Sequence, residues 1–531
     1  MKRDETISIV AALLGVIAGA LLAVLVMKAT AGRKLSVEGP GWSKVIAVLN
    51  TVDADYVDEI DHKAVSEDVI SETLSRLDPH SMYMPPVQRQ ASEEDLSGGF
   101  EGIGIQFNVP NDTAIVLEVI PGGPSEKVGI MPGDRLIKVD ETVIAGVKYP
   151  QDSMVRRMKG PSGTKVTIRV LRDGEETPFE ITRGRIPLHS VDASFMLNDT
   201  TGYIRLTKFS ATTSDEFRSA SAELLSKGMT HLITDLRDNS GGYLNQSLFL
   251  SNLFLEKGRT IVYTEGLHDP RHDYLADGRG SLKDIALTVL INENSASASE
   301  IVAGAVQDND RGVIIGRRSF GKGLVQKLYE FSDGSGMRLT VSRYHTPSGR
   351  CIQKPYNGEE DYADDLYNRY LGGEMLDADS IKVDKSEEYH TVGGRTVYGG
   401  GGIVPDIFVP MDTTRASDFY LKCSRKATPM RFASFWFDSH KAQLSEIDDF
   451  ASLTRYLDAS SIEKNFLDFA RQRDGLVPAS RSEWEESRSY MLTQVRALVG
   501  RYSKLGEKAY YYIYSEIDTT IQEALKPHSL D

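Results

Sequence analysis

The chain has 531 residues, of which 40% are hydrophobic and 26% are charged, a composition typical of a globular protein with several domains. Its formal net charge of -15 argues against a nucleic-acid-binding protein, which would need a basic surface. Two cysteines, Cys351 and Cys423, are too few for a disulfide framework, and the sequence does not decide whether they pair. Neither lies in a metal-ligand spacing and the ten histidines are scattered, so we predict no metal site and no cofactor.

The first segment, residues 1–31, carries a signal for export. Residues 7–27 include no charged side chain, and as a helix they would extend about 31 Å, enough to cross a bilayer core of about 30 Å. Basic residues precede this stretch, and its apolar run is longer than that of a usual cleaved signal peptide. The length favours an uncleaved anchor in a bacterial inner membrane with the catalytic part exported, periplasmic or otherwise extracytoplasmic. The alternatives are a secreted protein cleaved near Ala31 and a buried core helix.

The next segment, residues 32–95, has apolar residues at mixed three- and four-residue spacing from Trp42 to about Gln90, which predicts helices. A helix stop and a turn follow at residues 77–84. On composition alone, this segment is a cap on a larger domain.

Residues 96–185 are dense in short strands and turn glycines. The run GIGI at 102–105 opens a strand whose glycines let successive N–H groups face a carboxylate, while the strand edge accepts an extended peptide. Two glycine turns follow in order, at 121–130 and 132–140. Together these elements resemble a PDZ domain, which implies the capture of polypeptide C-termini. The predicted peptide-binding residues are Gly102, Ile103, Gly104 and Ile105.

Strands alternate with helices from residue 186 to 411. A strand at 202–206, a helix at 214–227 and a strand at 231–237 are followed by the glycine turn at 238–242. Repeated βα units predict an α/β core. Within this core, residues 357–398 are rich in acidic residues and tyrosines, and we interpret them as a solvated surface insertion.

Residues 290–326 carry the strongest chemical signal. A buried strand at 285–291 turns into the serine-alanine run 295–299 and then into a helix, so a hydroxyl at the helix mouth is placed to be a nucleophile. Lys322 lies between two glycines at the entrance to another strand, where a desolvated lysine can lose its proton near neutral pH and activate a serine. Lys322 and Gln326 share parity, so on a strand both point to one side.

The two-part pattern N-x-x-S-A-S-A-S-E and F-G-K-G-x-V-Q resembles the active-site pair of the carboxyl-terminal processing peptidases, or tail-specific proteases. The resemblance implies that Ser297 is the nucleophile, that Lys322 is its base and that Gln326 orients Lys322.

The same resemblance implies an oxyanion hole and an auxiliary acid. The amide after the nucleophile, that of Ala298, would act together with the amide of Gly241 or Gly242. Ser240 stands where many relatives carry proline or glycine, a departure that leaves this backbone role intact. Asp308, eleven positions after Ser297, corresponds to an aspartate that matters in some members, and it is equally interpreted as a helix-end surface residue.

The expected fold is multidomain α/β: a ClpP/crotonase-like protease core of βα units with an inserted PDZ domain, an N-terminal membrane helix and a helical C-terminal extension. The resemblance also implies that the N-terminal helical segment packs on the core or mediates dimers, so a homo-oligomer is possible. The expected function is that of a serine endopeptidase that processes or degrades exported proteins from their C-terminal tails. The PDZ domain would bind these polypeptide substrates, and gating of activity is a further role that the resemblance implies for it.

Residues 412–531 predict helices that pack on each other or on a partner, and the tyrosine-rich run at 510–514 is more typical of helix packing than of a binding platform. Two rival functions remain. A Ser-His-Asp triad could use His345, although no histidine lies in a recognisable motif. A PDZ scaffold on an inactive protease-like fold would only bind C-termini, but the intact Ser297, Lys322 and Gln326 argue against it.

Overall fold

The computed structural model describes residues 41–528 apart from 110–111, 121, 173, 357–361 and 414. The predicted anchor at 1–31 therefore lies outside the described residues. Within the described part of the chain, no helix combines the length and the apolar character needed to span a bilayer. The chain divides into two compact units, Met1–Glu72 and Thr73–Asp531. The first contains α2 (Trp42–Asp55) and most of α3 (His62–Ser75), in the region where helices were predicted.

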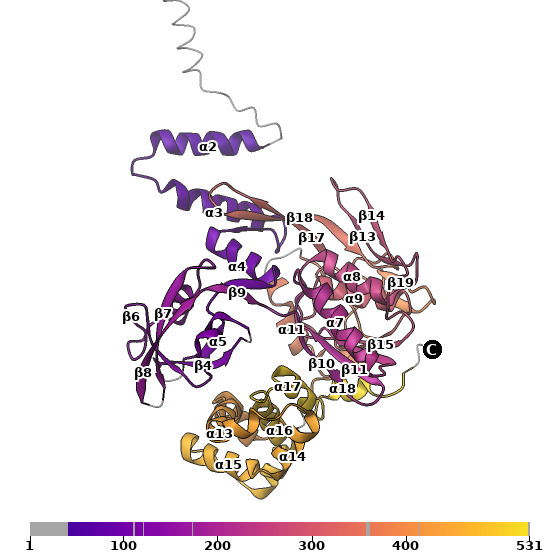
Figure 1. Ribbon diagram of the computed structural model, residues 1–531. Coiled ribbons are helices and arrows are strands. Elements are labelled where there is room, and N and C mark those ends of the chain that lie inside the picture. Colours follow the sequence, from indigo (N-terminus) through magenta and orange to yellow (C-terminus); the bar gives the residue numbers. More distant parts are fainter. Residues whose placement is uncertain are drawn as a thin grey trace, which may run out of the picture. The chain divides into compact units, whose positions relative to one another are not determined.

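The glycine-rich module is a small β-domain within the second unit (Figure 1). Its sheet has the order β3-β4-β5-β7-β8, with β6 paired to β5. In β7, Val166, Ile168 and Val170 are buried and alternate with more exposed residues, the period expected when one face of a strand packs on a core. The bounds are β3 (Ile105–Asn108), β4 (Ala114–Val119), β5 (Arg135–Val139), β6 (Thr142–Val143), β7 (Lys165–Arg172), β8 (Glu175–Thr182), α5 (Pro124–Val128) and α6 (Gln151–Met158).

The two ends of this module are joined by a separate ladder. Strand β2 (Gly99–Gly102) pairs antiparallel with β9 (Gly184–Pro187), so the chain enters and leaves the module at one place. Such neighbouring ends are what an inserted domain requires. Helix α4 (Pro86–Leu96) precedes β2.

The central sheet of the α/β core has the order β10-β11-β12-β15-β16-β21. All of its neighbouring strands are parallel except the β10–β11 pair. Strand β15 is buried at every position after its first, as expected for a parallel strand covered on both faces. The bounds are β10 (Val191–Met196), β11 (Thr201–Leu206), β12 (His231–Asp235), β15 (Ala286–Ile291), β16 (Val313–Gly316) and β21 (Ile407–Phe408).

Two apolar clusters cover the two faces of this sheet. Helices α7 (Thr213–Ser226), α8 (Leu244–Phe254) and α9 (Ala298–Asp308) contribute to one cluster. The other cluster contains Ile233 and Leu290 from the sheet together with Ile521 and Ala524 from the end of the chain. The C-terminal extension therefore supplies part of the core of the α/β domain.

A second sheet contains a long hairpin, which the sequence does not predict to pair with the N-terminal region. Its order is β1-β18-β13-β14, and β17 also pairs with β18. Strand β1 comes from the predicted N-terminal segment 32–95 and pairs antiparallel with β18. The bounds are β1 (Met82–Met84), β13 (Thr260–Glu265), β14 (His272–Leu275), β17 (Leu324–Glu330) and β18 (Gly336–His345).

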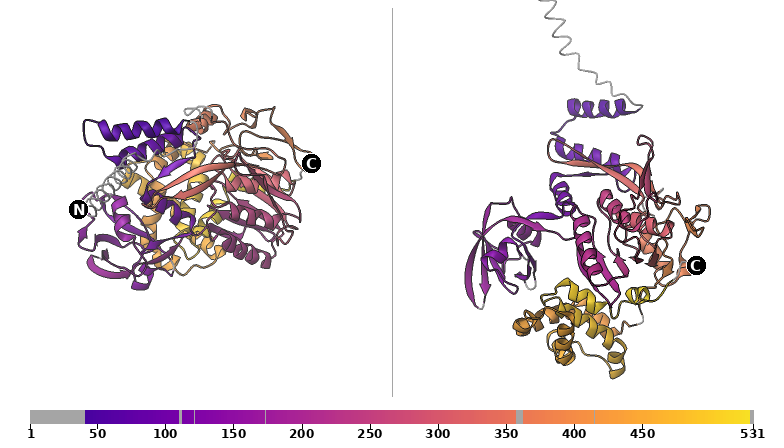
Figure 2. Two further views of the ribbon diagram at one scale, coloured as in Figure 1. Left: turned by 90° about the horizontal axis from the view of Figure 1, so that it is seen from above. Right: turned by 45° about the vertical axis from the view of Figure 1, so that its right-hand side comes forward.

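The C-terminal extension is helical, as predicted, and Figure 2 shows most of its gold helices gathered into one group. They enclose an aromatic core that includes Phe432, Trp436 and Phe466. The tyrosine run lies in α17, where Tyr510, Tyr512 and Tyr514 pack against this core, which confirms the prediction of helix packing. The bounds are α12 (Asp418–Arg425), α13 (Thr428–Leu444), α14 (Phe450–Ala459), α15 (Ile462–Phe469), α16 (Arg481–Gly500), α17 (Glu507–Tyr514) and α18 (Thr519–Ala524).

The predicted solvated insertion at 357–398 is only partly solvated. It contains α11 (Asp365–Leu371), and the side chains of Arg369, Glu374 and Met375 are buried. The interpretation as a solvated loop is therefore wrong for residues 369–375, where Arg369 and Glu374 pair with each other and with Arg318 of the core, while most other described charged residues of the insertion are exposed. Cys351 and Cys423 are both free thiols in the structure.

Candidate active site

Ser297 lies at a sharp turn between β15 and α9. Its backbone has φ 55° and ψ -112°, a conformation that non-glycine residues rarely adopt and that costs about 1 to 3 kcal/mol. The flanking serines fix this turn, because Ser295 Oγ donates to Leu236 O (2.8 Å) and Ser299 Oγ donates to Asn239 O (2.8 Å). Both flanking serines are fully buried, whereas Ser297 is half-buried. The middle serine of the run is therefore the one that can meet a substrate.

Lys322 precedes β17, and its ammonium group belongs to a short hydrogen-bonded chain. Lys322 Nζ donates to Gln326 Oε1 (3.2 Å), and Gln326 Nε2 donates to His80 O (2.6 Å). Burial and, to a smaller extent, the positive charge of Arg338 lower the pKa of Lys322, while Glu300 raises it in part. Among the described residues, no hydrogen bond joins Lys322 Nζ to Ser297 Oγ.

One buried carboxylate connects the two loops. Glu300 is fully buried, and its Oε2 accepts the N–H groups of Ser297 (2.8 Å) and Lys322 (2.9 Å). Its Oε1 accepts from Ser319 Oγ (2.5 Å) and from Gly321 N (2.7 Å). Burial raises the pKa of Glu300 to about 7, although these hydrogen bonds lower it. Sequence reasoning did not single out Glu300; a signal was available, since it stands at the third helical position, where a carboxylate reaches back to the N-cap amide.

Tyr344 on β18 also connects the two loops, through the backbone carbonyl groups of Ser297 and Lys322. Its hydroxyl lies 3.1 Å from Ser297 O and makes a shorter hydrogen bond to Lys322 O. Glu300 thus contacts the N–H groups of Ser297 and Lys322, and Tyr344 contacts their carbonyl groups. This four-contact arrangement, which we call the bracket, sets the spacing of the two backbones.

The glycine turn after β12 lies against Ser297, because the carboxyl ends of β12 and β15 are neighbours in the sheet. A Cβ atom on Gly241 would lie 2.8 Å from Ser297 Cβ and 2.9 Å from Ala298 N, so only glycine allows this approach. Gly241 N donates to Asn239 Oδ1 (2.9 Å). Within the described residues, the amides of Gly242 and Ala298 have no hydrogen-bond partner.

Two other predicted residues are not brought to Ser297. Asp308 ends α9, about 16 Å along the helix from Ser297. It is fully buried and binds Arg350 (2.7 Å) and Ser348, so its interpretation as a surface residue is wrong. His345 stacks on Tyr263 with ring centroids 4.7 Å apart, and its Nδ1 lies 3.0 Å from Gly349 O.

His80 is a residue near the lysine that the sequence marked only as part of a helix stop. Its Nε2 lies 2.5 Å from the hydroxyl of Tyr362, at the start of the insertion. Burial and the charge of Lys322 lower the pKa of His80 to about 4, so the ring is neutral at physiological pH. A neutral ring beside Lys322 adds no charge that would oppose a protonated intermediate.

The predicted peptide-binding residues lie at one edge of the small β-domain. Gly102 ends β2, Ile103 is buried in the domain core, and Gly104 has φ 76°. Ile105 begins β3, which is the terminal strand of its sheet order. A terminal strand of this kind offers backbone N–H and C=O groups to an added strand.

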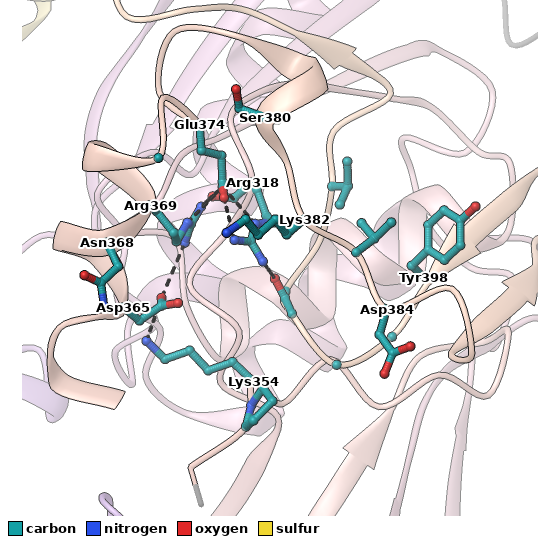
Figure 3. A pocket seen from close by; sticks show the side chains of 18 residues that line it. Arg318, Lys354, Asp365, Asn368, Arg369, Glu374, Ser380, Lys382, Asp384 and Tyr398 are labelled. Carbon is teal, nitrogen blue, oxygen red and sulfur yellow. Dashed lines mark hydrogen bonds and ion pairs between the residues drawn. The ribbon is translucent and has the colours of Figure 1, made fainter. Parts of the chain in front are cut away.

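The loop at 319–323, which carries Lys322, is called the lysine loop. A cavity of about 470 Å³ lined by Arg318 lies next to it and is shown in Figure 3. Ser297, Lys322 and Gln326 are not among its lining residues. Arg318 and Arg369 both bind the carboxylate of Glu374, and Arg369 also donates to Arg318 O (2.7 Å) and Ser319 O (3.1 Å). The buried part of the insertion therefore fixes the chain just before the lysine loop. No cluster of potential metal ligands occurs among the described residues.

Comparison with known proteins identifies the family. Peptidase family S41 matches residues 200–362, and the PDZ domain family matches residues 102–182. A probable CtpA-like serine protease of Staphylococcus haemolyticus (strain JCSC1435) is 31% identical over 358 residues, covering 67% of this chain and 69% of that protein. The chain belongs to peptidase family S41.

Other known proteins are also similar to this chain. A probable CtpA-like serine protease of Staphylococcus aureus (strain N315) is 34% identical over 312 residues, or 58% of this chain, and the chain spans 62% of that relative's length. Among solved structures, the photosystem II D1 C-terminal processing protease is 26% identical and covers 69% of this chain and 86% of its own, with a TM-score of 0.38. The PDZ domain of a carboxy-terminal protease from Vibrio cholerae, solved with a peptide, is 33% identical over 17% of this chain and 99% of its own, with a TM-score of 0.16.

Proposed function

We propose that this S41 peptidase is a serine endopeptidase that processes or degrades exported proteins from their C-terminal tails, with Ser297 and Lys322 as its catalytic dyad. The observation that carries the proposal is the bracket. Ser297 and Lys322 lie on separate loops, yet the same two buried side chains, Glu300 and Tyr344, contact the backbone of both. A fold with no use for this pair would not need to fix the two residues against each other.

The proposed reaction is acyl transfer through an acyl-enzyme. Neutral Lys322 takes the proton of the Ser297 hydroxyl as Oγ attacks the scissile carbonyl, and the resulting ammonium returns a proton to the leaving amine. Water then attacks the ester, with Lys322 again acting as base, and the acid product and free Ser297 are released. Gln326 holds Lys322 through its side-chain carbonyl.

The oxyanion would be stabilised by the amides of Ala298 and Gly242. Ala298 N is the first amide of α9, which has no intrahelical acceptor. We favour Gly242 over Gly241 because the Gly241 amide already donates to Asn239. Donors aimed at the developing charge are worth about 3 to 4 kcal/mol each.

The small β-domain would select the substrate. A C-terminal tail would add as a strand to β3, with its carboxylate at the amides of residues 102–105. We extend the proposal to gating, in which peptide binding moves Lys322 from Gln326 toward Ser297. The proposal also includes a ClpP/crotonase-like core and a homo-oligomer, both of which rest on the sequence resemblance. It further includes an inner-membrane protein with an exported catalytic part, or a secreted form, and this location rests on the sequence of residues 1–31.

The test compares the wild type with Ser297→Ala and Lys322→Ala on a secreted protein that ends in an apolar C-terminus. Lys327→Ala is a matched control, since Lys327 lies on β17, the strand that follows Lys322, with its side chain 55% exposed and 3.8 Å from Asp269. We expect cleavage by the wild type and by Lys327→Ala only. Binding without cleavage by the wild type would favour a PDZ scaffold, and full cleavage by Lys322→Ala would exclude the dyad.

A further inference from the structure

We call the glycine turn at 238–242 the oxyanion loop. The end of the C-terminal extension contacts Arg237, the residue just before this loop. Asp518 precedes α18, and its Oδ1 accepts the N–H groups of Thr520 (3.0 Å) and Ile521 (3.1 Å). The same carboxylate accepts two hydrogen bonds from Arg237, from Nη1 to Oδ1 (3.0 Å) and from Nη2 to Oδ2 (2.8 Å). A bidentate pair of this kind fixes the direction of the guanidinium group as well as its distance.

Arg237 is held on its other side by a buried carboxylate of the sheet. Asp235 is fully buried and accepts from Arg237 Nε (3.0 Å) and Nη2 (2.7 Å), and also from Arg205 Nη1 (3.1 Å). Although burial alone would raise the pKa of Asp235, Arg237 and Arg205 hold it well below its usual range. The cluster therefore has two arginine charges, those of Arg205 and Arg237, and Asp518 supplies one of the carboxylate charges that balance them, beside Asp235 and Asp238. Without Asp518, the positive charge of Arg237 is only partly balanced.

Arg237 is covalently continuous with the oxyanion loop, so its position fixes where the loop begins. The next residue, Asp238, has φ 62°, and its carboxylate lies 3.6 Å from Arg205. Asn239 then anchors the loop, because its Nδ2 donates to Leu206 O (2.8 Å) and its carbonyl accepts Ala296 N (3.0 Å). A shift of Arg237 therefore moves a loop that is hydrogen-bonded to the turn carrying Ser297.

We propose that Asp518 is a positioning residue, which fixes the oxyanion loop through Arg237 so that the C-terminal extension completes the active site. This role deepens the proposed function and rests on it. It assigns a use in catalysis to a segment that lies far from the dyad in the sequence. It also explains why the last helix of the chain is docked on the catalytic sheet rather than on the other helices of the extension alone.

The docking of α18 does not depend on the ion pair. Ile521 and Ala524 are buried against Ile233, Leu290 and other apolar residues of the sheet. In Asp518→Asn, the amide oxygen can still cap α18, since asparagine is as good an N-cap as aspartate. The charge is lost, and the NH₂ group replaces the oxygen that accepts from Arg237 Nη2. The variant therefore removes the proposed function of Asp518 and keeps its structural one.

The matched control is Asp474→Asn. Asp474 is also an aspartate of the extension with little side-chain exposure, 4% against 10% for Asp518, and it binds Arg431 (2.7 Å) and Thr428 (2.5 Å). Its partners lie within the extension. A loss of stability alone should affect the two variants alike, whereas a positioning role affects only Asp518→Asn.

We expect Asp518→Asn to lower kcat by about ten- to a hundredfold with KM within about twofold, because misplaced donors weaken transition-state stabilisation more than substrate binding. Asp474→Asn should keep the wild-type kcat, and Asp518→Glu should lie between the wild type and Asp518→Asn. Wild-type kcat in folded Asp518→Asn, or an equal loss in Asp474→Asn, would overturn the assignment.

Hydrogen exchange of the peptide covering residues 236–242 gives a readout that needs no activity. Exchange there should be faster in Asp518→Asn than in the wild type and unchanged in Asp474→Asn; equal exchange in all three would overturn the assignment. If Asp518→Asn did not fold, Asp518→Glu would replace it, and wild-type values of both kcat and exchange would then refute the role. The proposed function has a separate test. It would be refuted by a wild type that neither cleaves the tail substrate nor reacts at Ser297 with a fluorophosphonate. Hydrogen exchange at residues 236–242 would still test the role of Asp518 in that case.

Discussion

Lys322 works as a base only when it is neutral, and its surroundings favour that state. Burial first, and the charge of Arg338 second, lower its pKa from the ordinary lysine value. The neutral fraction rises with pH, so kcat/KM should rise along an acid limb and level off above the lowered pKa of Lys322. Steady-state rates across pH 5 to 10 measure this limb. Lys322→Arg should be inactive at every pH, because a guanidinium group does not deprotonate in this range; an activity that is flat across the range would contradict the dyad.

Glu300 has a cost for stability and a benefit for the site. Burial raises its pKa to about 7, above the ordinary value, so the folded protein binds a proton that the unfolded chain has lost. Protonated Glu300 therefore makes its full contribution to the free energy of unfolding below the ordinary carboxyl pKa. This contribution, about 3 kcal/mol, is lost as the pH rises through 7 toward 8. The benefit is that the carboxylate accepts four hydrogen bonds, which hold the backbones of Ser297 and Lys322 in place.

Glu300→Gln should separate the two effects. An amide NH₂ would face two N–H groups of the bracket, so we expect kcat to fall by about ten- to a hundredfold. The free energy of unfolding of the variant, relative to the wild type, should improve between pH 5.5 and pH 8, because the titration is gone. Urea unfolding at both pH values and steady-state kinetics measure these changes. Glu216→Gln is the control, since Glu216 also accepts two backbone N–H groups, those of Ser190 and Val191, away from the dyad; a similar loss of kcat there would refute a specific role for Glu300.

At the scale of elements, the oxyanion loop depends on a close approach that only glycine permits. Gly241→Ala would place a Cβ atom 2.8 Å from Ser297 Cβ and from Ala296 O, both parts of a rigid turn. We expect a loss of kcat of at least about a hundredfold with a modest fall in stability. Gly228→Ala is the control, because Gly228 has a similar positive φ of 93° but its Cβ would meet only Asp199 O at 3.9 Å. Equal kinetics for the two variants would show that backbone strain, and not contact with Ser297, is responsible.

The sequence predicts local elements better than the contacts between them. The strand-turn-helix around Ser297 follows from the apolar run before it and the small residues within it, and the PDZ-like sheet follows from alternation and turn glycines. In contrast, nothing in the local pattern indicates that residues 82–84 pair with β18, that His80 accepts from Gln326, or that Tyr344 reaches Ser297. These contacts join positions far apart in the chain, and periodicity reports only on neighbours within one element.

Buried polar groups are the other part that the sequence does not predict. Asp308, Arg369 and Glu374 look like ordinary surface charges in a linear sequence, yet each is buried with a partner. The partner decides burial, because an unpaired charge could not remain in the interior. Since the partner is distant in sequence, the charge run at 357–398 is indistinguishable from a solvated loop until the fold is known.

At the scale of the whole molecule, the catalytic sheet and the C-terminal extension share one apolar cluster. Ile521 is 1% exposed and packs with sheet residues such as Ile233 and Leu290. Ile521→Ala should therefore destabilise the catalytic core by about 2 to 4 kcal/mol through lost burial and a residual cavity. Met430→Ala is the control within the extension, because Met430 is 54% exposed and its truncation should change stability by less than about 0.5 kcal/mol. Urea unfolding followed by the loss of tail-cleaving activity measures both variants, and a wild-type midpoint for Ile521→Ala would mean that the extension folds independently of the catalytic sheet.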